Sequence, residues 1–174
     1  MDPIASAAMK AGLGATGVVV LSIRMERSNR PLSWFGVTAP PIVPTLGFLA
    51  VYLAWMLGSD ALTHWRGPWD FRTWQQAPLL ASALRLLAVC VLGPVVEELL
   101  FRGIIFSWLR ERVNVGLTIG ATALGWSLLH YDFAWWVIAI IFVDGVILGL
   151  ARWRTRSVFA PAVMHMLYNL YAIW

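Results

Sequence analysis

Six apolar segments, joined by short polar connections, dominate the sequence and restrict how the chain can fold. They cover residues 11–23, 42–58, 78–109, 115–130, 133–150 and 158–174. Several are shorter than the roughly 20 residues that cross a bilayer, so we expect tilted or partly inserted helices. Strands with open edges would leave backbone groups without partners in lipid. The pattern therefore predicts an all-α, polytopic transmembrane bundle of about six helices.

The composition excludes a soluble domain of this size. Hydrophobic residues make up 60% of the 174 residues and charged residues only 13%, and a small soluble fold has too much surface to bury that much apolar material. We expect one membrane domain over residues 1–174, with its first apolar stretch retained, since it lacks the features of a cleavable signal. Cys90 is the only cysteine, so the sequence offers neither a disulfide framework nor a thiol metal site.

The charged residues indicate topology rather than a polyanionic partner. The formal net charge is +4, but the basic residues form short clusters between apolar segments, without the aromatic-basic groove of a nucleic-acid-binding protein. Segments 24–30, 110–114 and 152–156 are basic, whereas 59–76 is balanced and 131–133 is acidic. The positive-inside rule places the three basic segments in the cytoplasm. Much of the balanced segment, HWRGPWDFRTWQQ, is expected to lie along the membrane surface.

Ionisable residues inside membrane segments are rare, and they usually face the bundle interior at functional sites. The polar candidates in the apolar segments are Arg85, Glu97, Glu98, Arg102, His130, Asp144, His165 and Asn169. Glu98 and Arg102 are four residues apart and can pair along one helix face. Glu97 points about 100° away. It therefore keeps an unpaired carboxyl group, which suits a general base.

The two histidines repeat this four-residue spacing. His165 shares a helix face with Asn169, as His130 does with Trp126. Each histidine alone is more often a structural residue, but three polar pairs on three helices indicate one shared site. Counted at about 1.5 Å per residue, four residues lie about 12 to 24 Å from the basic ends of their helices. They are Glu97, His130, His165 and Asn169. We expect them to meet at or beyond mid-membrane, on the outward side.

Taken in order, these motifs resemble those of the CPBP family of CAAX-processing and bacteriocin-processing membrane proteases. This family is also called Abi and is related to the type II CAAX prenyl endopeptidases. The matching motifs are Glu97-Glu98 with Arg102 (EExxxR), an aromatic residue four positions before His130, and His165-xxx-Asn169. Trp126 occupies a position where the family usually has phenylalanine. The resemblance covers residues 78–174, the expected catalytic core, while residues 1–77 carry no family motif.

The resemblance implies a glutamate-type intramembrane endopeptidase that needs no metal or cofactor. Glu97 would activate the hydrolytic water with help from His130. His165 and Asn169 would stabilise the oxyanion of the tetrahedral intermediate, a role that suits fixed hydrogen-bond donors.

Three further side chains are expected to support the site. By the same resemblance, Glu98 and Arg102 would orient the motif helix. Asp144 lies outside the motifs but at the calculated depth of His165, so it can orient that imidazole. Alternatively, Asp144 pairs with Arg85 or borders an aqueous cavity.

Two other interpretations remain open. Glu97, His130 and His165 form a set of one carboxylate and two histidines that can hold a divalent metal, although the chain has no HExxH motif. The protein can also be a non-enzymatic immunity, scaffolding or ligand-binding membrane protein that carries the family's residues. The absence of evident inverted repeats argues against a transporter.

The calculated depth also bears on the substrate. A site on the outward side suits cleavage of a membrane-tethered protein or peptide tail of an exported protein, as in sortase-like members of the family. If Arg102 instead marks the lipid boundary, Glu97 moves toward the cytoplasmic face and the site residues no longer share one depth. Prenyl-CAAX processing would require a cytoplasmic opening and a host that prenylates proteins, and the sequence shows neither. We expect a multi-pass protein of the bacterial cytoplasmic membrane that contacts the lipid bilayer and its substrate but no nucleic acid.

Overall fold

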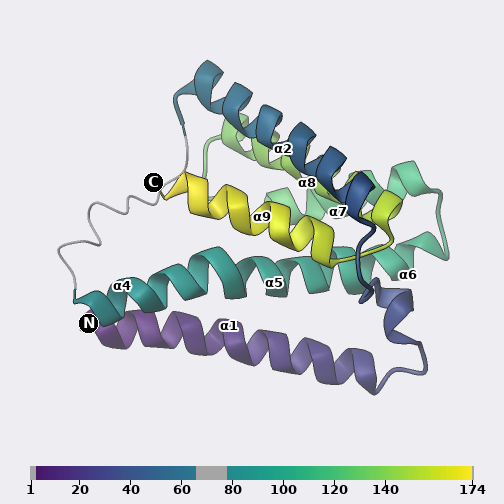
Figure 1. The fold of residues 1–174 in the computed structure, drawn as a ribbon, viewed down its shortest axis with the longest axis horizontal. Helices are drawn as coiled ribbons and strands as arrows, with labels where there is room; N and C mark the ends of the chain where they lie inside the picture. Colours follow the sequence, from purple (N-terminus) through teal and green to yellow (C-terminus); the bar gives the residue numbers. More distant parts are fainter. Residues whose placement is uncertain (1–2, 66–77, 174) are drawn as a thin grey trace.

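The fold is a bundle of helices. Figure 1 shows the computed structural model, which describes residues 3–65 and 78–173. Every regular element in these residues is a helix, which confirms the all-α class. Residues 66–77, which contain most of the segment expected along the membrane surface, and Trp174 lie outside the described residues.

The helices follow the six predicted apolar segments closely. They are α1 (Pro3–Glu26), α2 (Ile42–Thr63), a long composite helix over 79–110, α7 (Val115–Leu128), α8 (Trp135–Thr155) and α9 (Phe159–Ala172). The first, second, composite and α8 helices are long and apolar enough to cross a membrane, whereas α7 and α9 have 14 residues each. The short 3-10 helix η1 (Leu32–Phe35) lies between α1 and α2.

Several helix ends differ from the predicted bounds, for example the end of α2 at Thr63 and of α8 at Thr155, and two differences affect residues that line the candidate site. The first helix begins at Pro3 rather than residue 11, because alanines and methionines favour a helix even where Ser6 and Lys10 lower the hydropathy. α7 ends at Leu128, so His130 lies in the turn that follows. There the backbone N–H of His130 donates to the carbonyl of Ser127 at 3.0 Å.

The composite helix contains two π-helical segments between α-helical ones. It consists of α4 (Leu79–Leu86), η2 (Leu87–Leu92), α5 (Gly93–Glu98), η3 (Leu99–Ile105) and α6 (Phe106–Arg110), of which η2 and η3 are π-helical. The π segments flank the short α5 that carries Glu97 and Glu98. Isolated π turns within α-helices often occur at functional sites.

The three basic segments lie together at one end of the bundle, on the right in Figure 1. Arg30, after α1, forms an ion pair with Glu111, after α6, at 2.8 Å. The hydroxyl of Thr38 donates to the carbonyl of Arg156, after α8, at 3.1 Å. The three basic segments therefore share one end of the bundle, as the charge pattern predicts, and the assignment of this end to the cytoplasm stays a prediction.

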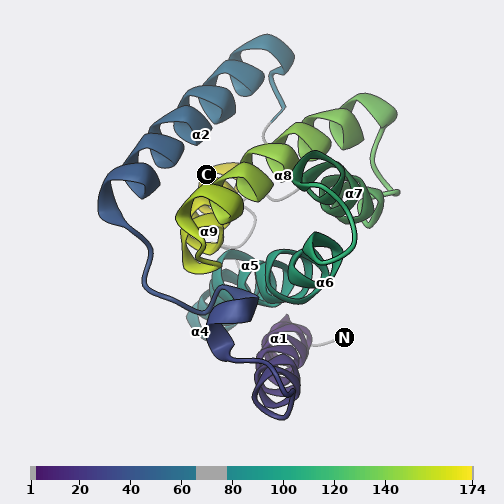
Figure 2. The ribbon, with the colours of Figure 1, turned by 90° about the vertical axis from the view of Figure 1, so that its right-hand side faces the viewer.

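Helices α2, α7, α8 and α9 and the η3 segment share one apolar core. Tyr52, Phe101, Trp126, Leu148 and Met164 are buried members of it. α7 and α8 pack closely at Gly145, where an added Cβ would lie 2.9 Å from the Cβ of Ala123. Helix α1 packs at the edge of the bundle along α4 and α5 (Figure 2). On its other side the composite helix contacts α9 through α5 and α7 through η3, and α7 and α9 carry other candidate residues.

Candidate active site

A fully buried ion pair anchors the site. Glu98 and Arg102 have no exposed side-chain surface, and Arg102 Nη1 lies 2.9 Å from Glu98 Oε1. Arg102 Nη2 donates to the carbonyl of Gly145 on α8 at 3.2 Å. The spacing-based prediction of this pair is confirmed. The pair ties the composite helix to α8 at the level of the glutamates.

The same glutamate orients His165 of α9. Its Nδ1 lies 3.1 Å from Glu98 Oε1, and the imidazole is only 5% exposed. Because Glu98 is paired with Arg102, its carboxylate acts as the acceptor, so Nδ1 carries the proton. The other ring nitrogen, Nε2, lies 3.9 Å from Glu97 Oε2 and is the atom presented to the cavity.

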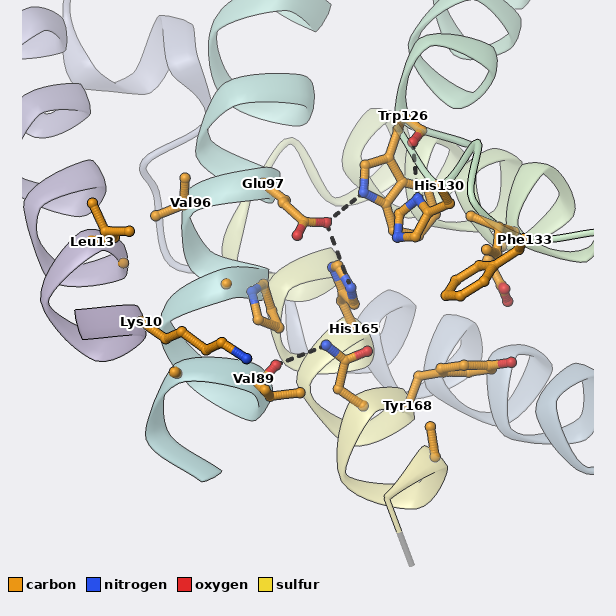
Figure 3. A pocket seen from close by; sticks show the side chains of 18 of the residues that line it. Lys10, Leu13, Val89, Val96, Glu97, Trp126, His130, Phe133, His165 and Tyr168 are labelled. Carbon is orange, nitrogen blue, oxygen red and sulfur yellow. Dashed lines mark hydrogen bonds and ion pairs between the residues drawn. The ribbon is translucent and has the colours of Figure 1, made fainter. Parts of the chain in front are cut away.

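Glu97 has a different environment from its neighbour, as the helical spacing predicts. Its side chain is 33% exposed and points toward Trp126 and His165 in the cavity (Figure 3). Its Oε2 accepts a hydrogen bond from the indole Nε1 of Trp126 at 2.6 Å. One glutamate of the adjacent pair is thus neutralised inside the bundle, and the other faces open space.

Trp126 contacts more of the site than the sequence analysis expected. Its side chain is 3% exposed, and its ring lies edge-on to those of His130 and His165, with centroid distances of 5.5 and 5.1 Å. The Arg102 guanidinium lies 4.8 Å from the ring centroid. The sequence placed Trp126 on one helix face with His130 and as an aromatic replacement in the family motif, but it did not predict a contact with Glu97. The available signal was its N–H group, which phenylalanine lacks.

His130 reaches the cavity from the turn after α7. Its Nδ1 lies 3.2 Å from the carbonyl oxygen of Trp126. A carbonyl only accepts, so Nδ1 carries the proton and Nε2 is left for a water or substrate. The ring also stacks on Phe133 at a centroid distance of 6.0 Å. His130 and Glu97 line the same cavity.

Asn169 is held by a backbone group that Pro94 leaves without its usual donor. In η2 the N–H of Gly93 bonds to the carbonyl of Ala88, five residues back. The corresponding donor for the carbonyl of Val89 would be residue 94, which is proline and has no N–H. Asn169 Nδ2 donates to that carbonyl at 2.8 Å. The amide has a second N–H, and Asn169 also lines the cavity.

Asp144 does not hydrogen-bond to His165, whose hydrogen-bonded acid is Glu98. Asp144 is 2% exposed and accepts a hydrogen bond from Trp55 Nε1 at 2.9 Å. It borders the cavity, as one of the alternatives anticipated. Residue counting gives depth along a helix but not rotation about its axis, which is why depth alone suggested the wrong partner.

The site residues enclose a cavity of about 550 Å³ between α1, α2, the composite helix, α7, α8 and α9. It gathers Glu97, His130, His165, Asn169 and Asp144. Lys10, Tyr52 and Tyr168 line it as well and were missed by sequence reasoning. Lys10 could have been considered from the sequence, because it lies one residue before the predicted start of the first helix.

The set of Glu97, His130 and His165 does not assemble as a metal site. Within residues 3–65 and 78–173, no three His, Cys, Asp or Glu side chains lie close enough together to hold a metal ion. The cavity instead presents the Glu97 and Asp144 carboxylates, two imidazoles and a side-chain amide. A base and hydrogen-bond donors around one cavity are the elements of a hydrolytic site.

Comparison with known proteins agrees with a membrane-embedded hydrolase. Residues 79–171, more than half of the chain, match the family model described as Type II CAAX prenyl endopeptidase Rce1-like. The chain belongs to this family and is an integral membrane peptidase of the CAAX protease class. The matched region contains all the candidate catalytic residues.

Three bacterial relatives are similar over different parts of the chain. A Staphylococcus aureus protein named membrane-embedded CAAX protease MroQ is 26% identical over 92% of this chain and 69% of its own. An uncharacterised 24.3 kDa protein of Escherichia coli is 29% identical over 67% of this chain and 55% of its own. The putative membrane peptidase YdiL of Bacillus subtilis is 24% identical over 53% and 37%. No solved structure matches.

Proposed function

We propose that the protein is a glutamate-type intramembrane endopeptidase in which Glu97 activates the hydrolytic water. The observation that carries this proposal is the contrast between the two adjacent glutamates. Glu98 forms a buried ion pair with Arg102. Glu97 instead faces the cavity, where its Oε2 lies 3.9 Å from Nε2 of His165. A carboxylate held in a mostly apolar cavity is a suitable general base.

The remaining groups complete a hydrolytic reaction. Glu97, assisted by His130, takes a proton from water, and the hydroxide oxygen attacks the carbonyl carbon of the scissile peptide bond. The oxyanion accepts a hydrogen bond from the second N–H of Asn169. His165 donates a further hydrogen bond through Nε2 when the ring carries a second proton in addition to the one on Nδ1. When the C–N bond breaks, the proton taken up by Glu97 passes to the leaving amine.

The proposed substrate is a membrane-tethered protein or peptide tail of an exported protein. The cavity lies inside a bundle of apolar helices, so a substrate segment that is already in the membrane reaches it without crossing bulk water. The Staphylococcus aureus relative is named a CAAX protease, which supports a tail-processing reaction. Because the three relatives are bacterial, we place the protein in the bacterial cytoplasmic membrane.

The test is cleavage of candidate tail proteins in proteoliposomes by wild type and by Glu97→Gln, each with and without a chelator. We expect Glu97→Gln to lower the rate by about two to four orders of magnitude and the chelator to leave wild type unaffected. Glu26→Gln is a matched control, because Glu26 is exposed at the end of α1. Wild-type rates for Glu97→Gln would refute the assignment, and chelator-sensitive activity restored by zinc would favour metal catalysis.

A further inference from the structure

A second cavity, of about 460 Å³, lies at the basic end of the bundle. It is formed by η1, α6 and the C-terminal end of α8, and it shares no described lining residue with the active-site cavity. Its lining includes Trp34, Arg110, Glu111, Arg152, Trp153, Arg154 and Arg156. Four arginines and one acid therefore line one small space.

Arg152 is the buried member of this group, with 6% of its surface exposed. Its Nε donates to the carbonyl of Arg102 at 2.9 Å. Its Nη2 lies 3.3 Å from the hydroxyl of Ser107 and 3.5 Å from the carbonyl of Trp34. All of these acceptors are neutral. They fix the orientation of the guanidinium without balancing its charge.

Arg152 has no carboxylate partner in the part of the chain that the structure describes. Glu111, the one acid among the described lining residues, is held by Arg30 at 2.8 Å and by Trp34 Nε1 at 3.0 Å. Arg102, by contrast, is fully buried and has Glu98 as its partner. A buried charge without a counter-ion is unfavourable by several kcal/mol as an order of magnitude. The protein therefore gains stability if an anion enters the cavity.

The backbone near η1 is adapted to this arginine. Gly36 has a φ of 80°, and a Cβ there would lie 2.4 Å from Arg152 Cζ. Glycine alone both adopts this conformation readily and leaves room for the guanidinium. The position of Arg152 is thus built into the connection between α1 and α2.

The rim of the cavity carries exposed cations and an aromatic ring. Arg154 and Arg156 are exposed, and the Arg154 guanidinium lies 4.5 Å from the ring centroid of Trp153. Arg110 Nη1 donates to the carbonyl of Val113 at 2.9 Å. Trp153 is 37% exposed, as expected for an indole at the level of lipid headgroups.

We propose that this cavity binds the phosphate group of an anionic membrane phospholipid, with Arg152 as the buried contact and Arg110, Arg154 and Arg156 around the headgroup. Guanidinium groups match the geometry of phosphate oxygens and form paired, charge-assisted hydrogen bonds with them. The cavity lies at the ends of α6 and α8, and in a bundle that spans the bilayer basic pockets at helix ends suit anionic lipids. This site is independent of the proposed catalytic mechanism.

The test measures binding of phosphatidylglycerol to the purified protein in zwitterionic micelles, by the lipid-dependent rise of its unfolding temperature. A ligand that binds only the folded state raises this temperature. Arg154→Gln with Arg156→Gln should weaken binding about tenfold or more, which corresponds to about 1.4 kcal/mol. Arg24→Gln with Arg27→Gln removes the same charge at the same end, from exposed positions outside the cavity, and should change binding less than about twofold.

Arg152→Gln tests the buried contact, because glutamine keeps a hydrogen-bond donor but no charge. Without anionic lipid this variant should unfold at or above the wild-type temperature, and phosphatidylglycerol should stabilise it little. Equal losses in the two double variants would show diffuse charge attraction and overturn the proposal. Inorganic phosphate that stabilises the wild type as strongly as the lipid would also overturn it, in favour of a soluble anion. Phosphatidylcholine in place of phosphatidylglycerol should have no effect.

Discussion

At the scale of single residues, the indole N–H of Trp126 gives the Glu97 carboxylate a fixed orientation. The bond is 2.6 Å long, and the same ring contacts both His130 and His165. One side chain therefore sets the positions of the proposed base and of two other groups. Positioning of this kind contributes to catalysis because the reacting groups are held ready before the substrate arrives.

Trp126→Phe tests the contribution of the hydrogen bond separately from that of the ring, because phenylalanine keeps an aromatic contact but has no N–H. A hydrogen bond to a charged group contributes about 1.5 to 3 kcal/mol, so we expect kcat to fall about tenfold or more with little change in KM. The measurement is the cleavage rate as a function of substrate concentration. An unchanged kcat, with unchanged thermal stability, would mean that the indole N–H does not assist Glu97.

Contacts within one helix could be predicted from the sequence, whereas contacts between helices could not. The i to i+4 spacing correctly predicted that Glu98 pairs with Arg102 while Glu97 points elsewhere, because both facts follow from one helix alone. The partner of Asp144 and the donor to Glu97 depend on how α2, α7 and α8 rotate against other helices. No spacing within one helix contains that information. Six helices were predictable from hydropathy, but the π segments were not.

At the scale of elements, Pro94 and Asn169 depend on each other through the carbonyl of Val89. Proline removes the backbone donor, and the Asn169 amide replaces it at 2.8 Å. An unpaired carbonyl at this depth would be costly in lipid. The composite helix therefore continues past Pro94 with the help of a side chain from α9.

A double-mutant cycle tests this dependence. Pro94→Ala restores a backbone N–H at the position that the π-helical pattern pairs with Val89. Asn169→Ala should therefore destabilise the protein less in the Pro94→Ala background than in wild type, with a coupling energy of about 1 kcal/mol. Chemical unfolding of the four proteins in micelles gives this energy. Simple additivity of the two changes would contradict the proposed dependence.

The contact between α7 and α8 gives a second prediction at this scale. In Gly145→Ala, the new methyl group would lie 2.9 Å from Ala123 Cβ and 3.2 Å from the Trp126 ring. We expect destabilisation by about 1 to 3 kcal/mol and slower cleavage, because Trp126 shifts. Gly120→Ala on α7 is the control, since an added Cβ there meets nothing within 4 Å. Equal stabilities for the two variants, measured by thermal unfolding, would contradict close packing at Gly145.

At the scale of the whole molecule, loop charge and architecture agree. The three basic segments meet at one end, where Arg30 pairs with Glu111. In the positive-inside arrangement this end faces the cytoplasm, and the turn at 129–134 that carries His130 faces outward. The orientation therefore decides from which side a substrate approaches the active-site cavity.

Cysteine accessibility in cells tests the orientation. With buried Cys90 replaced by alanine, Asp132→Cys should react with a membrane-impermeant maleimide in intact cells. Arg154→Cys should react only after the cells are opened, because residue 154 lies at the basic end. The reverse pattern would invert the topology and place the turn at 129–134 in the cytoplasm.

The lengths of α7 and α9 have a consequence for the membrane itself. Each helix has 14 residues and spans about 21 Å at 1.5 Å per residue, whereas the hydrocarbon layer is about 30 Å thick. A bilayer adapts to a short apolar span by becoming thinner around it. These are the helices that carry Trp126, His165 and Asn169, so we expect the membrane to be thinner beside the proposed hydrolytic site than elsewhere around the bundle. The water consumed in the reaction would then come from a local depression of the bilayer surface, and we expect lipids with longer acyl chains to slow its supply.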